Sequence, residues 1–295
     1  MSGQFHDWMT STLSEFERNL DNLLPTATTT PTHLHEAMRY AVLDGGKRMR
    51  PLVVFAAGCL FDAPAELLNR AAAALEMIHA YSLVHDDMPC MDDDALRRGK
   101  PTVHIKYNQA TALLVGDALQ AQAFIVLSEG DAFAERKLHM LQTLAKAAGS
   151  VGMCGGQAID LASVGLALNL PELERMHRLK TGALLNASVL LGAMSGKILS
   201  SRETVALNNY SNAIGLAFQV VDDVLDATAD SATLGKTAGK DAAANKPTYV
   251  SLLGLDASKL LAEKLCDDAH RAVLPLGEKA QYLRDLANLI VQRKA

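Results

Sequence analysis

This chain of 295 residues contains few cysteines and few prolines. Its 4 cysteines, Cys59, Cys90, Cys154 and Cys266, are widely spaced and form no Cys-x-x-Cys pair. That spacing argues against a disulfide framework or a structural zinc site, and a reducing compartment is expected. The 9 prolines interrupt the chain rarely and alanine is abundant, so the composition favours helices.

Basic charge and long apolar segments are also lacking. Lys and Arg number 28 against 33 Asp and Glu, and the net charge of -5 offers no broad basic surface for nucleic acid. The longest apolar stretches, such as Ala183 to Met194, fall short of the about 20 residues that span a bilayer. The N-terminus shows no basic segment followed by an apolar one, so no secretory signal is expected. We therefore expect a cytoplasmic protein with no membrane span and no nucleic-acid partner.

Apolar residues recur at helical spacing along most of the chain, and strand-like alternation is nowhere sustained. We predict an all-α fold, a single domain over residues 1–295 in which about ten or more helices surround a central active-site cavity. The expected helices cover residues 5–23, 32–43, 51–60, 64–88, 112–128, 131–148, 153–164, 171–195, 202–226, 258–273 and 277–293. Residues 228–249 are predicted to form the longest loop, and such loops are often lids or binding loops.

The first chemical feature is the segment Asp86-Asp87-Met88-Pro89-Cys90-Met91-Asp92-Asp93-Asp94, which follows an apolar helix. Like charges repel each other, and a helix C-terminus adds partial negative charge. A bound cation relieves this repulsion, and oxygen-only ligands select Mg²⁺ or Ca²⁺ rather than zinc. A solvated acidic turn is the alternative interpretation, whereas the spacing excludes an EF-hand loop.

A second acidic group favours the metal interpretation. Gln219, Asp222, Asp223 and Asp226 are spaced i, i+3, i+4 and i+7, so they share one face of an otherwise apolar helix. Carboxylates set into a core helix are costly unless they are paired or bind a metal. Two such helices in one all-α domain predict a metal cluster between them.

Positive charge arrives in short clusters. They are Gly46-Lys47-Arg48-Met49-Arg50-Pro51, Arg97-Arg98-Gly99-Lys100-Pro101, Lys180-Thr181-Gly182, Gly235-Lys236-Thr237 and Lys246-Pro247. The first cluster follows a Gly-Gly turn and enters a helix, which is a natural anion site. Acidic clusters with Arg and Lys nearby predict that a diphosphate is bound through Mg²⁺ and charge-assisted hydrogen bonds.

These motifs resemble those of the trans-isoprenyl diphosphate synthases. Asp86-Asp87-x4-Asp92-x4-Arg97-Arg98 is similar to the family's first aspartate-rich motif, in the longer form typical of bacteria and plastids. Phe218–Asp226 is similar to the second motif, and its full Asp-Asp-x-x-Asp distinguishes it from the motif of terpene cyclases. The basic clusters and His79 fall in matching order, so the resemblance covers the chain from about residue 30 onward.

The resemblance implies a prenyltransferase that joins isopentenyl diphosphate to an allylic diphosphate and works as a homodimer. The implied ligands of three Mg²⁺ ions, which Mn²⁺ could replace, are Asp86, Asp92, Asp222 and Asp226. The implied contacts of the allylic diphosphate are Arg97, Lys180, Thr181, Gln219, Lys236 and Lys246. Those of isopentenyl diphosphate are Lys47, Arg50, His79 and Arg98. The expected catalytic residues are Asp86, Asp87, Asp92, Arg97, Lys180, Asp222 and Asp223.

The implied chemistry follows from charge. When the carbon–oxygen bond of the allylic diphosphate breaks, Mg²⁺ and basic side chains stabilise the charge that develops on the leaving group. The double bond of isopentenyl diphosphate attacks the resulting allylic cation, and by analogy with the family the departing pyrophosphate takes the proton. The cavity for the apolar chain must exclude water, because water would quench the cation.

Tyr81 predicts the length of the product. It precedes Asp86 by five residues, about 7.5 Å along a helix axis, so its ring can close the tunnel of the allylic chain. The neighbouring Ser82 is too small to do so. We therefore expect the C15 product farnesyl diphosphate, made from dimethylallyl and geranyl diphosphate. The alternatives are C20 synthesis, since small residues at this position go with longer products in the family, and an ordinary core tyrosine.

Two other classes of protein are weighed against this interpretation. His85-Asp86 with His79 and His104 nearby would suit a helical HD-type metal phosphohydrolase, but that reading leaves the acids of residues 222–226 unexplained. A non-catalytic partner subunit would be expected to lack one acidic motif, whereas both are complete here.

Overall fold

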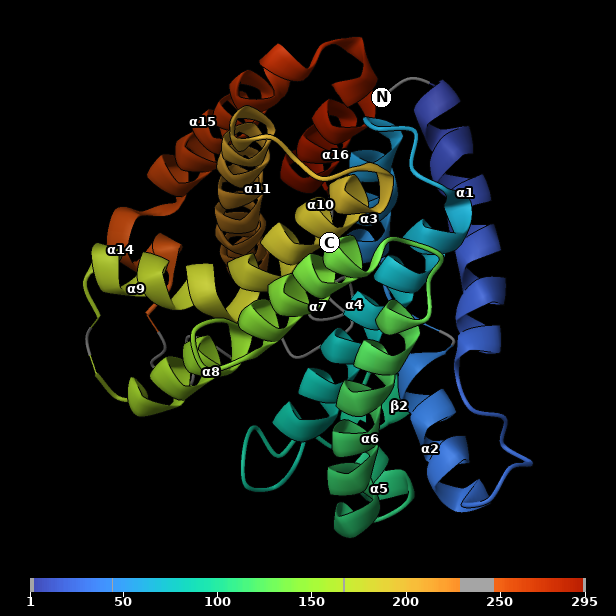
Figure 1. The fold of residues 1–295 in the computed structure, drawn as a ribbon. Coiled ribbons are helices and arrows are strands. Elements are labelled where there is room, and N and C mark those ends of the chain that lie inside the picture. Colours follow the sequence, from blue (N-terminus) through green and yellow to red (C-terminus); the bar gives the residue numbers. More distant parts are fainter. Residues whose placement is uncertain (1–2, 44, 167, 229–246, 294–295) are drawn as a thin grey trace.

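The computed structural model describes residues 3–43, 45–166, 168–228 and 247–293, and these are almost entirely helical (Figure 1). The first half contains α1 (Gly3–Leu23), α2 (Thr32–Val42), α3 (Met49–Cys59), α4 (Ala65–Asp86), β1 (Leu96–Arg97), β2 (Lys100–Pro101), α5 (Val103–Lys106), α6 (Gln109–Ser128) and α7 (Ala134–Ala148). The second half contains α8 (Met153–Ala162), α9 (Leu170–His177), the π-helical turn η1 (Arg178–Gly182), α10 (Ala183–Gly196), α11 (Ser201–Thr228), α14 (Tyr249–Leu253), α15 (Leu255–Val273), the short 3-10 turns η2 (Leu274–Leu276) and η3 (Glu278–Ala280), and α16 (Gln281–Gln292). The predicted all-α fold is confirmed.

Two local features differ from the sequence expectation. The helix expected over residues 171–195 is divided by η1, whose wider turn carries Lys180 and Thr181. The connection after α4 contains a small antiparallel hairpin in which Arg97 pairs with Lys100. Arg98 and Gly99 form its turn with φ of 53° and 74°, a left-handed geometry that suits a tight hairpin. The hairpin was missed because two-residue strands leave no alternation to detect.

The helices bury two apolar clusters that share α3 and α10. One cluster gathers side chains from α1, α2, α4, α6 and α7, and the other gathers side chains from α11, α15 and α16. On α10, Leu184 and Leu191 face the first cluster while Val189 and Ala193 face the second. Helix α4 packs against α3, α6 and α10, and its acidic C-terminal end leads into the connection at one end of the bundle (Figure 1).

Helix α6 is longer and more apolar than the helix predicted over residues 112–128. By length and composition it is the one described helix that could cross a membrane, and 44% of its apolar window is buried. In the structure α6 packs along α4 and contacts α2, α5 and α7, as the core helix of a globular bundle does. Three of its large apolar side chains, Leu113, Leu114 and Ile125, are exposed.

The contact between α10 and α3 generates a stability prediction. A Cβ atom at Gly192 would lie 2.2 Å from the Val54 carbonyl oxygen, so the two backbones approach each other too closely for a side chain. Gly192→Ala should destabilise the fold by about 1–3 kcal/mol through overpacking, which lowers Tm by several degrees. Thermal unfolding followed by circular dichroism measures this shift. Gly3→Ala, which has open space around it, is the control, and equal Tm values for the two variants would contradict the prediction.

Candidate active site

The end of α4 folds back on itself and brings the first acidic motif together. Asp86 is the last residue of α4, and its carbonyl oxygen accepts a hydrogen bond of 2.8 Å from the backbone N–H of Asp92. Burial raises the pKa of Asp86 to about 6; the charge of Lys180 opposes this rise and that of Asp92 adds to it. A half-buried carboxylate beside a second acid and near a lysine is a place where a hard cation is stabilised.

The middle acid of this motif has a different environment. Asp87 is 3% exposed, and both of its carboxylate oxygens accept hydrogen bonds of 2.6–2.9 Å from Arg97. Burial raises the pKa of Asp87, while the guanidinium of Arg97 opposes that rise. This bidentate ion pair with Asp87 therefore fixes the side chain of Arg97 in the hairpin.

Helix α11 repeats this arrangement. Asp223 is 5% exposed; its Oδ1 accepts a hydrogen bond of 3.0 Å from the Gln219 amide and its Oδ2 one of 2.8 Å from the backbone N–H of Tyr249. Gln219 in turn accepts a bond of 3.5 Å from the Thr181 hydroxyl. Asp222 and Asp226 are only half buried. In both motifs the middle acid is thus committed to the scaffold, while the outer acids are more accessible.

Lys180 and Thr181 are presented by the π-helical turn η1. A Cβ atom at Gly156 would lie 2.1 Å from the backbone nitrogen of Lys180, so only glycine lets α8 approach the turn this closely. One turn later on α8, Asp160 accepts a hydrogen bond of 2.6 Å from Lys180 Nζ. π-Helical turns are frequent at functional sites, and here the turn directs a lysine towards the acids of α4.

The four residues expected to bind isopentenyl diphosphate line one cavity of about 560 Å³. Lys47 comes from the loop before α3, Arg50 from the first turn of α3, His79 from α4 and Arg98 from the hairpin. Burial, with Arg50 and Arg98 adding to it, holds the pKa of His79 well below its ordinary value, so the imidazole is neutral at pH 7. The Nε of Arg50 is buried and makes no hydrogen bond within the described part of the chain. An anion in this cavity would meet a concentrated positive field.

Arg48 holds the loop that carries these residues. It adopts a left-handed φ of 46°, and its guanidinium bonds Glu76 at 2.7 Å, Glu17 at 2.6 Å and the Val42 carbonyl oxygen at 2.8 Å. Glu76 is 3% exposed and also lowers the electrostatic cost of Arg50 and Arg98. The buried ion pair therefore directs the neighbouring Lys47 and Arg50 towards the cavity.

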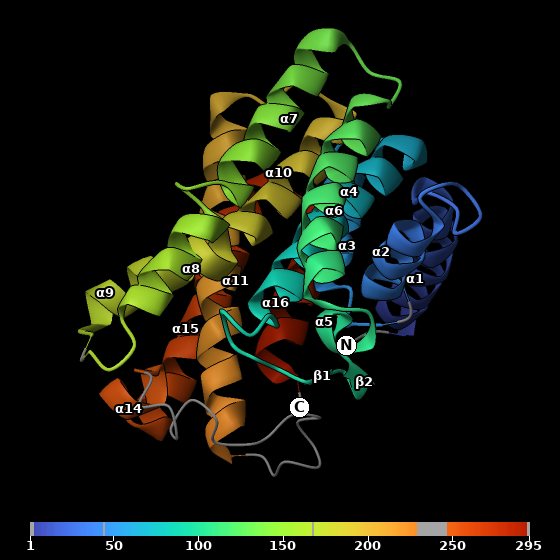
Figure 2. The same cartoon turned by 90° about the horizontal axis from the view of Figure 1, so that it is seen from below.

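Four further residues were predicted for the site: Tyr81, Ser82, Lys236 and Lys246. Tyr81 is 5% exposed on α4, and the Ser82 hydroxyl donates a hydrogen bond of 2.8 Å to the His79 carbonyl oxygen. Lys236 and Lys246 lie outside the described residues. Figure 2 shows the connection after α4, the last turns of α11 and the end of α16 on the same side of the molecule.

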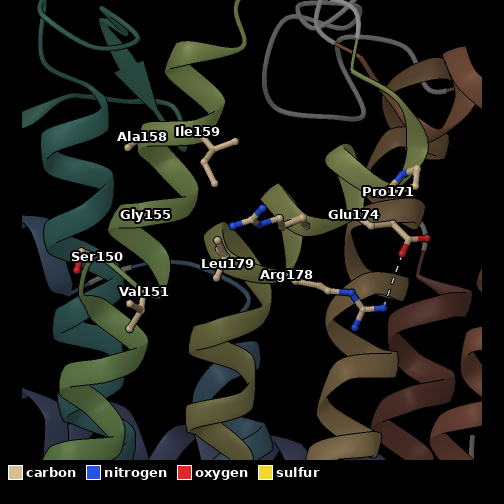
Figure 3. A pocket seen from close by; sticks show the side chains of 10 residues that line it. Ser150, Val151, Gly155, Ala158, Ile159, Pro171, Glu174, Arg178 and Leu179 are labelled. Atoms are coloured by element: carbon tan, nitrogen blue, oxygen red, sulfur yellow. Dashed lines mark ion pairs between the residues drawn. The ribbon is translucent and has the colours of Figure 1, made fainter.

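A separate groove of about 750 Å³ lies between α8 and α9 (Figure 3). Its lining includes Val151, Ile159 and Leu179 beside the ion pair between Arg178 and Glu174, whose atoms are 3.7 Å apart. None of the predicted site residues lines this groove, so the acidic and basic groups described above mark a different location.

Comparison with known proteins decides the family. The family model described as polyprenyl synthetase matches residues 31–274, a span that contains both acidic motifs and all the basic clusters. The chain belongs to this family. The resemblance to trans-isoprenyl diphosphate synthases is therefore confirmed, and the protein is a prenyltransferase.

Individual relatives in the polyprenyl synthetase family cover nearly the whole chain. A probable farnesyl diphosphate synthase of Sinorhizobium fredii is 50% identical over 282 residues, 95% of this chain and 85% of the relative. Geranylgeranyl pyrophosphate synthase 4 of Arabidopsis thaliana is 44% identical over 296 residues, 99% of this chain and 79% of the relative. A geranyltransferase of Helicobacter pylori, solved with magnesium and isoprenyl diphosphate, has a TM-score of 0.85 at 32% identity and covers 98% of this chain and 97% of its own.

This family assignment disfavours the phosphohydrolase alternative, and so do the histidines. His85 Nε2 lies 3.1 Å from the Leu113 carbonyl oxygen, and His104 is buried against the Thr102 hydroxyl at 3.1 Å. Within the described residues no three His, Cys, Asp or Glu side chains converge on one metal position. His85 and His104 are therefore best interpreted as structural residues.

The acidic residues nevertheless suit the Mg²⁺ that polyprenyl synthetases use. Mg²⁺ is commonly held by one or two carboxylates together with substrate phosphates, so a closed cage of protein ligands is not required. Asp86, Asp92, Asp222 and Asp226 supply only oxygen donors, and burial already makes the charge of Asp86 costly without a cation. The oxygen donors of these four side chains therefore fit Mg²⁺.

The sequence analysis did not identify three residues that contribute to the candidate site: Glu76, Asp160 and Arg293. Glu76 precedes His79 by one helical turn, and this spacing could have suggested it. Asp160 and Arg293 carry no local signal, because their partners Lys180 and Asp222 are 20 and 71 positions away. Arg293 stacks 3.9 Å above the Phe218 ring, and its Nη2 donates to Asp222 at 2.5 Å and to the Phe218 carbonyl oxygen at 2.8 Å.

The contact with Arg293 predicts a competition for Asp222. A metal ion and the guanidinium compete for the negative charge of Asp222, so Arg293→Gln should lower the Mg²⁺ concentration that gives half-maximal activity. Because Asp222 is 44% exposed, the pair is screened and worth at most about 1 kcal/mol, so the shift should be about two- to fivefold. Titration of activity with Mg²⁺ at saturating substrate measures it, with Arg293→Lys as the charge-conserving control. An unchanged or higher requirement in Arg293→Gln would refute the competition.

Proposed function

We propose that this prenyltransferase makes farnesyl diphosphate. It adds isopentenyl diphosphate to dimethylallyl diphosphate and then to geranyl diphosphate, and it releases pyrophosphate at each step. The observation that supports a C15 product is the buried ring of Tyr81, about 7.5 Å along α4 from Asp86, a position from which it can limit the length of the allylic chain. The 50% identical relative bears the same functional name, and a C20 product is the second candidate because the plant relative at 44% identity is a geranylgeranyl pyrophosphate synthase.

In this proposal two groups of side chains bind the two diphosphates. The allylic diphosphate is bound by three Mg²⁺ ions, which Mn²⁺ could replace. The side chains that hold these ions are Asp86, Asp92, Asp222 and Asp226. The direct contacts of the diphosphate are Arg97, Lys180, Thr181, Gln219, Lys236 and Lys246. Isopentenyl diphosphate occupies the 560 Å³ cavity of Lys47, Arg50, His79 and Arg98. Support comes from the common lining of that cavity and from the neutral state of His79, which can donate a hydrogen bond without being an acid at pH 7.

Side chains of the protein assist the breaking of the carbon–oxygen bond because they are held in place before the reaction begins. When bound, Mg²⁺ neutralises the charge that develops on the leaving diphosphate. Arg97, fixed by the buried Asp87, and Lys180, fixed by Asp160, present cations that need no rearrangement as that charge develops. The apolar side chains of α4 exclude water from the allylic cation, and pyrophosphate accepts the proton that the condensation releases. Asp87 and Asp223 act by holding other residues rather than by touching substrate.

We further propose that two copies of the chain associate and that the enzyme works in the cytoplasm. The support for a homodimer is the exposed apolar surface of α6, where Leu113, Leu114 and Ile125 are 49%, 54% and 48% exposed. Such a surface on a helix that is otherwise part of the core is typical of a subunit interface.

Metal dependence gives the first test of this function. Asp86→Asn keeps the shape of the side chain but removes a metal-binding charge, so turnover should fall by several orders of magnitude, because the lost stabilisation acts mainly on the transition state. Excess EDTA should abolish activity. Asp93→Asn is the matched control: Asp93 is exposed in the same loop with φ of 50°, a conformation that asparagine tolerates. Full activity in Asp86→Asn, or in EDTA, would contradict the proposal.

Product length gives the second test. Purified protein with Mg²⁺, geranyl diphosphate and excess isopentenyl diphosphate should stop at C15. Tyr81→Ala should shift the product towards C20 and longer, because the shortened side chain opens the tunnel. Chromatography of the dephosphorylated products reports chain length, and Ser82→Ala, whose hydroxyl bonds only the α4 backbone in the described structure, should keep C15. A C20 product from the unaltered protein would favour the second candidate.

A further inference from the structure

The hydroxyl of Tyr81 is held from a helix that is distant in sequence. Its Oη lies 3.4 Å from the Sγ of Cys154 on α8, a hydrogen-bonding contact between residues 73 positions apart. Gln120 of α6 interacts with the same hydroxyl. The tip of the ring is therefore fixed by α6 and α8, while its backbone belongs to α4.

The face of the ring is held separately. The ring of His85, one turn along α4, meets it edge-on with centroids 5.8 Å apart, and His85 is itself fixed to the Leu113 carbonyl oxygen at 3.1 Å. Cys154, by contrast, is exposed, whereas Tyr81 is 5% exposed. The sulfur is therefore an exposed partner of a buried hydroxyl, on the α8 side of the ring.

We propose that Cys154 is a positioning residue for product length, because its sulfur fixes the ring of Tyr81 as the end of the allylic tunnel. This inference rests on the proposed function, in which Tyr81 closes that tunnel. A C15 chain that could add one more isoprene unit presses on the ring. When the ring loses its contact with Cys154 it can tilt towards α8, and the tunnel then admits a further unit in a fraction of turnovers. Cys154 itself does not touch the reacting atoms.

The test compares product ratios in variants that differ by one atom. With excess isopentenyl diphosphate, Cys154→Ala should raise the ratio of C20 to C15 products about threefold or more, as expected for the loss of one hydrogen bond. Cys154→Ser keeps a hydroxyl partner at this position and should retain the ratio of the unaltered protein. Tyr81→Phe, which removes the contacts of the hydroxyl with both Cys154 and Gln120, should raise the ratio at least as much as Cys154→Ala. The double variant should not exceed Tyr81→Phe, because that change already removes the contact with Cys154.

In Cys154→Ala and Cys154→Ser the KM for isopentenyl diphosphate and the total turnover should stay within about twofold, since a general loss of structure would change them as well. Unchanged ratios in both Cys154→Ala and Tyr81→Phe, together with longer products from Tyr81→Ala, would overturn the role of Cys154 but keep Tyr81 as the tunnel end. Unchanged products from Tyr81→Ala would instead show that Tyr81 does not close the tunnel, and a C20 product from the unaltered protein would overturn the proposed function. Longer products from Cys154→Ser, or additive effects in the double variant, would also overturn the role of the contact.

Discussion

The arrangement of the site depends on the hydrogen bonds that two buried carboxylates accept. Asp87 and Asp223 are each the middle acid of an acidic motif, and each is almost fully buried. A buried carboxylate without partners is costly, so each must be bonded within the fold. Arg97 satisfies Asp87, while Gln219 and the backbone N–H of Tyr249 satisfy Asp223. These bonds fix the hairpin against α4 and the start of α14 against α11.

The outer acids owe their accessibility to the same bonds. With the middle acid facing inward, helical spacing turns Asp86 on α4, and Asp222 and Asp226 on α11, towards a more open side. Their charges remain close to Lys180 and Arg293, which moderate the repulsion in the absence of a metal. The fold therefore keeps part of its acidic surface accessible at a tolerable electrostatic cost.

The basic cavity follows a related principle. Arg50 and Arg98 line one cavity with the neutral His79, and the charge of the buried Glu76, which also pairs with Arg48, offsets part of the repulsion between the two arginines. A counter-charge of this kind lowers the cost of concentrating positive charge in a partly buried cavity. The positive potential that remains is directed to the open side, where an anionic substrate would bind.

The sequence by itself determined the helical class and the approximate bounds of most helices, because apolar residues at helical spacing report burial directly. It also determined the candidate acids and most of the basic residues, since Asp86–Asp92 and Gln219–Asp226 are local patterns on single helices. Only the tertiary structure decided which acid of each motif is buried, that Arg97 and Lys180 are held by Asp87 and Asp160, and that Arg293 and Cys154 reach Asp222 and Tyr81. The physical reason is that spacing along one helix is set by the backbone, whereas a pair between distant segments exists only after packing has brought them together.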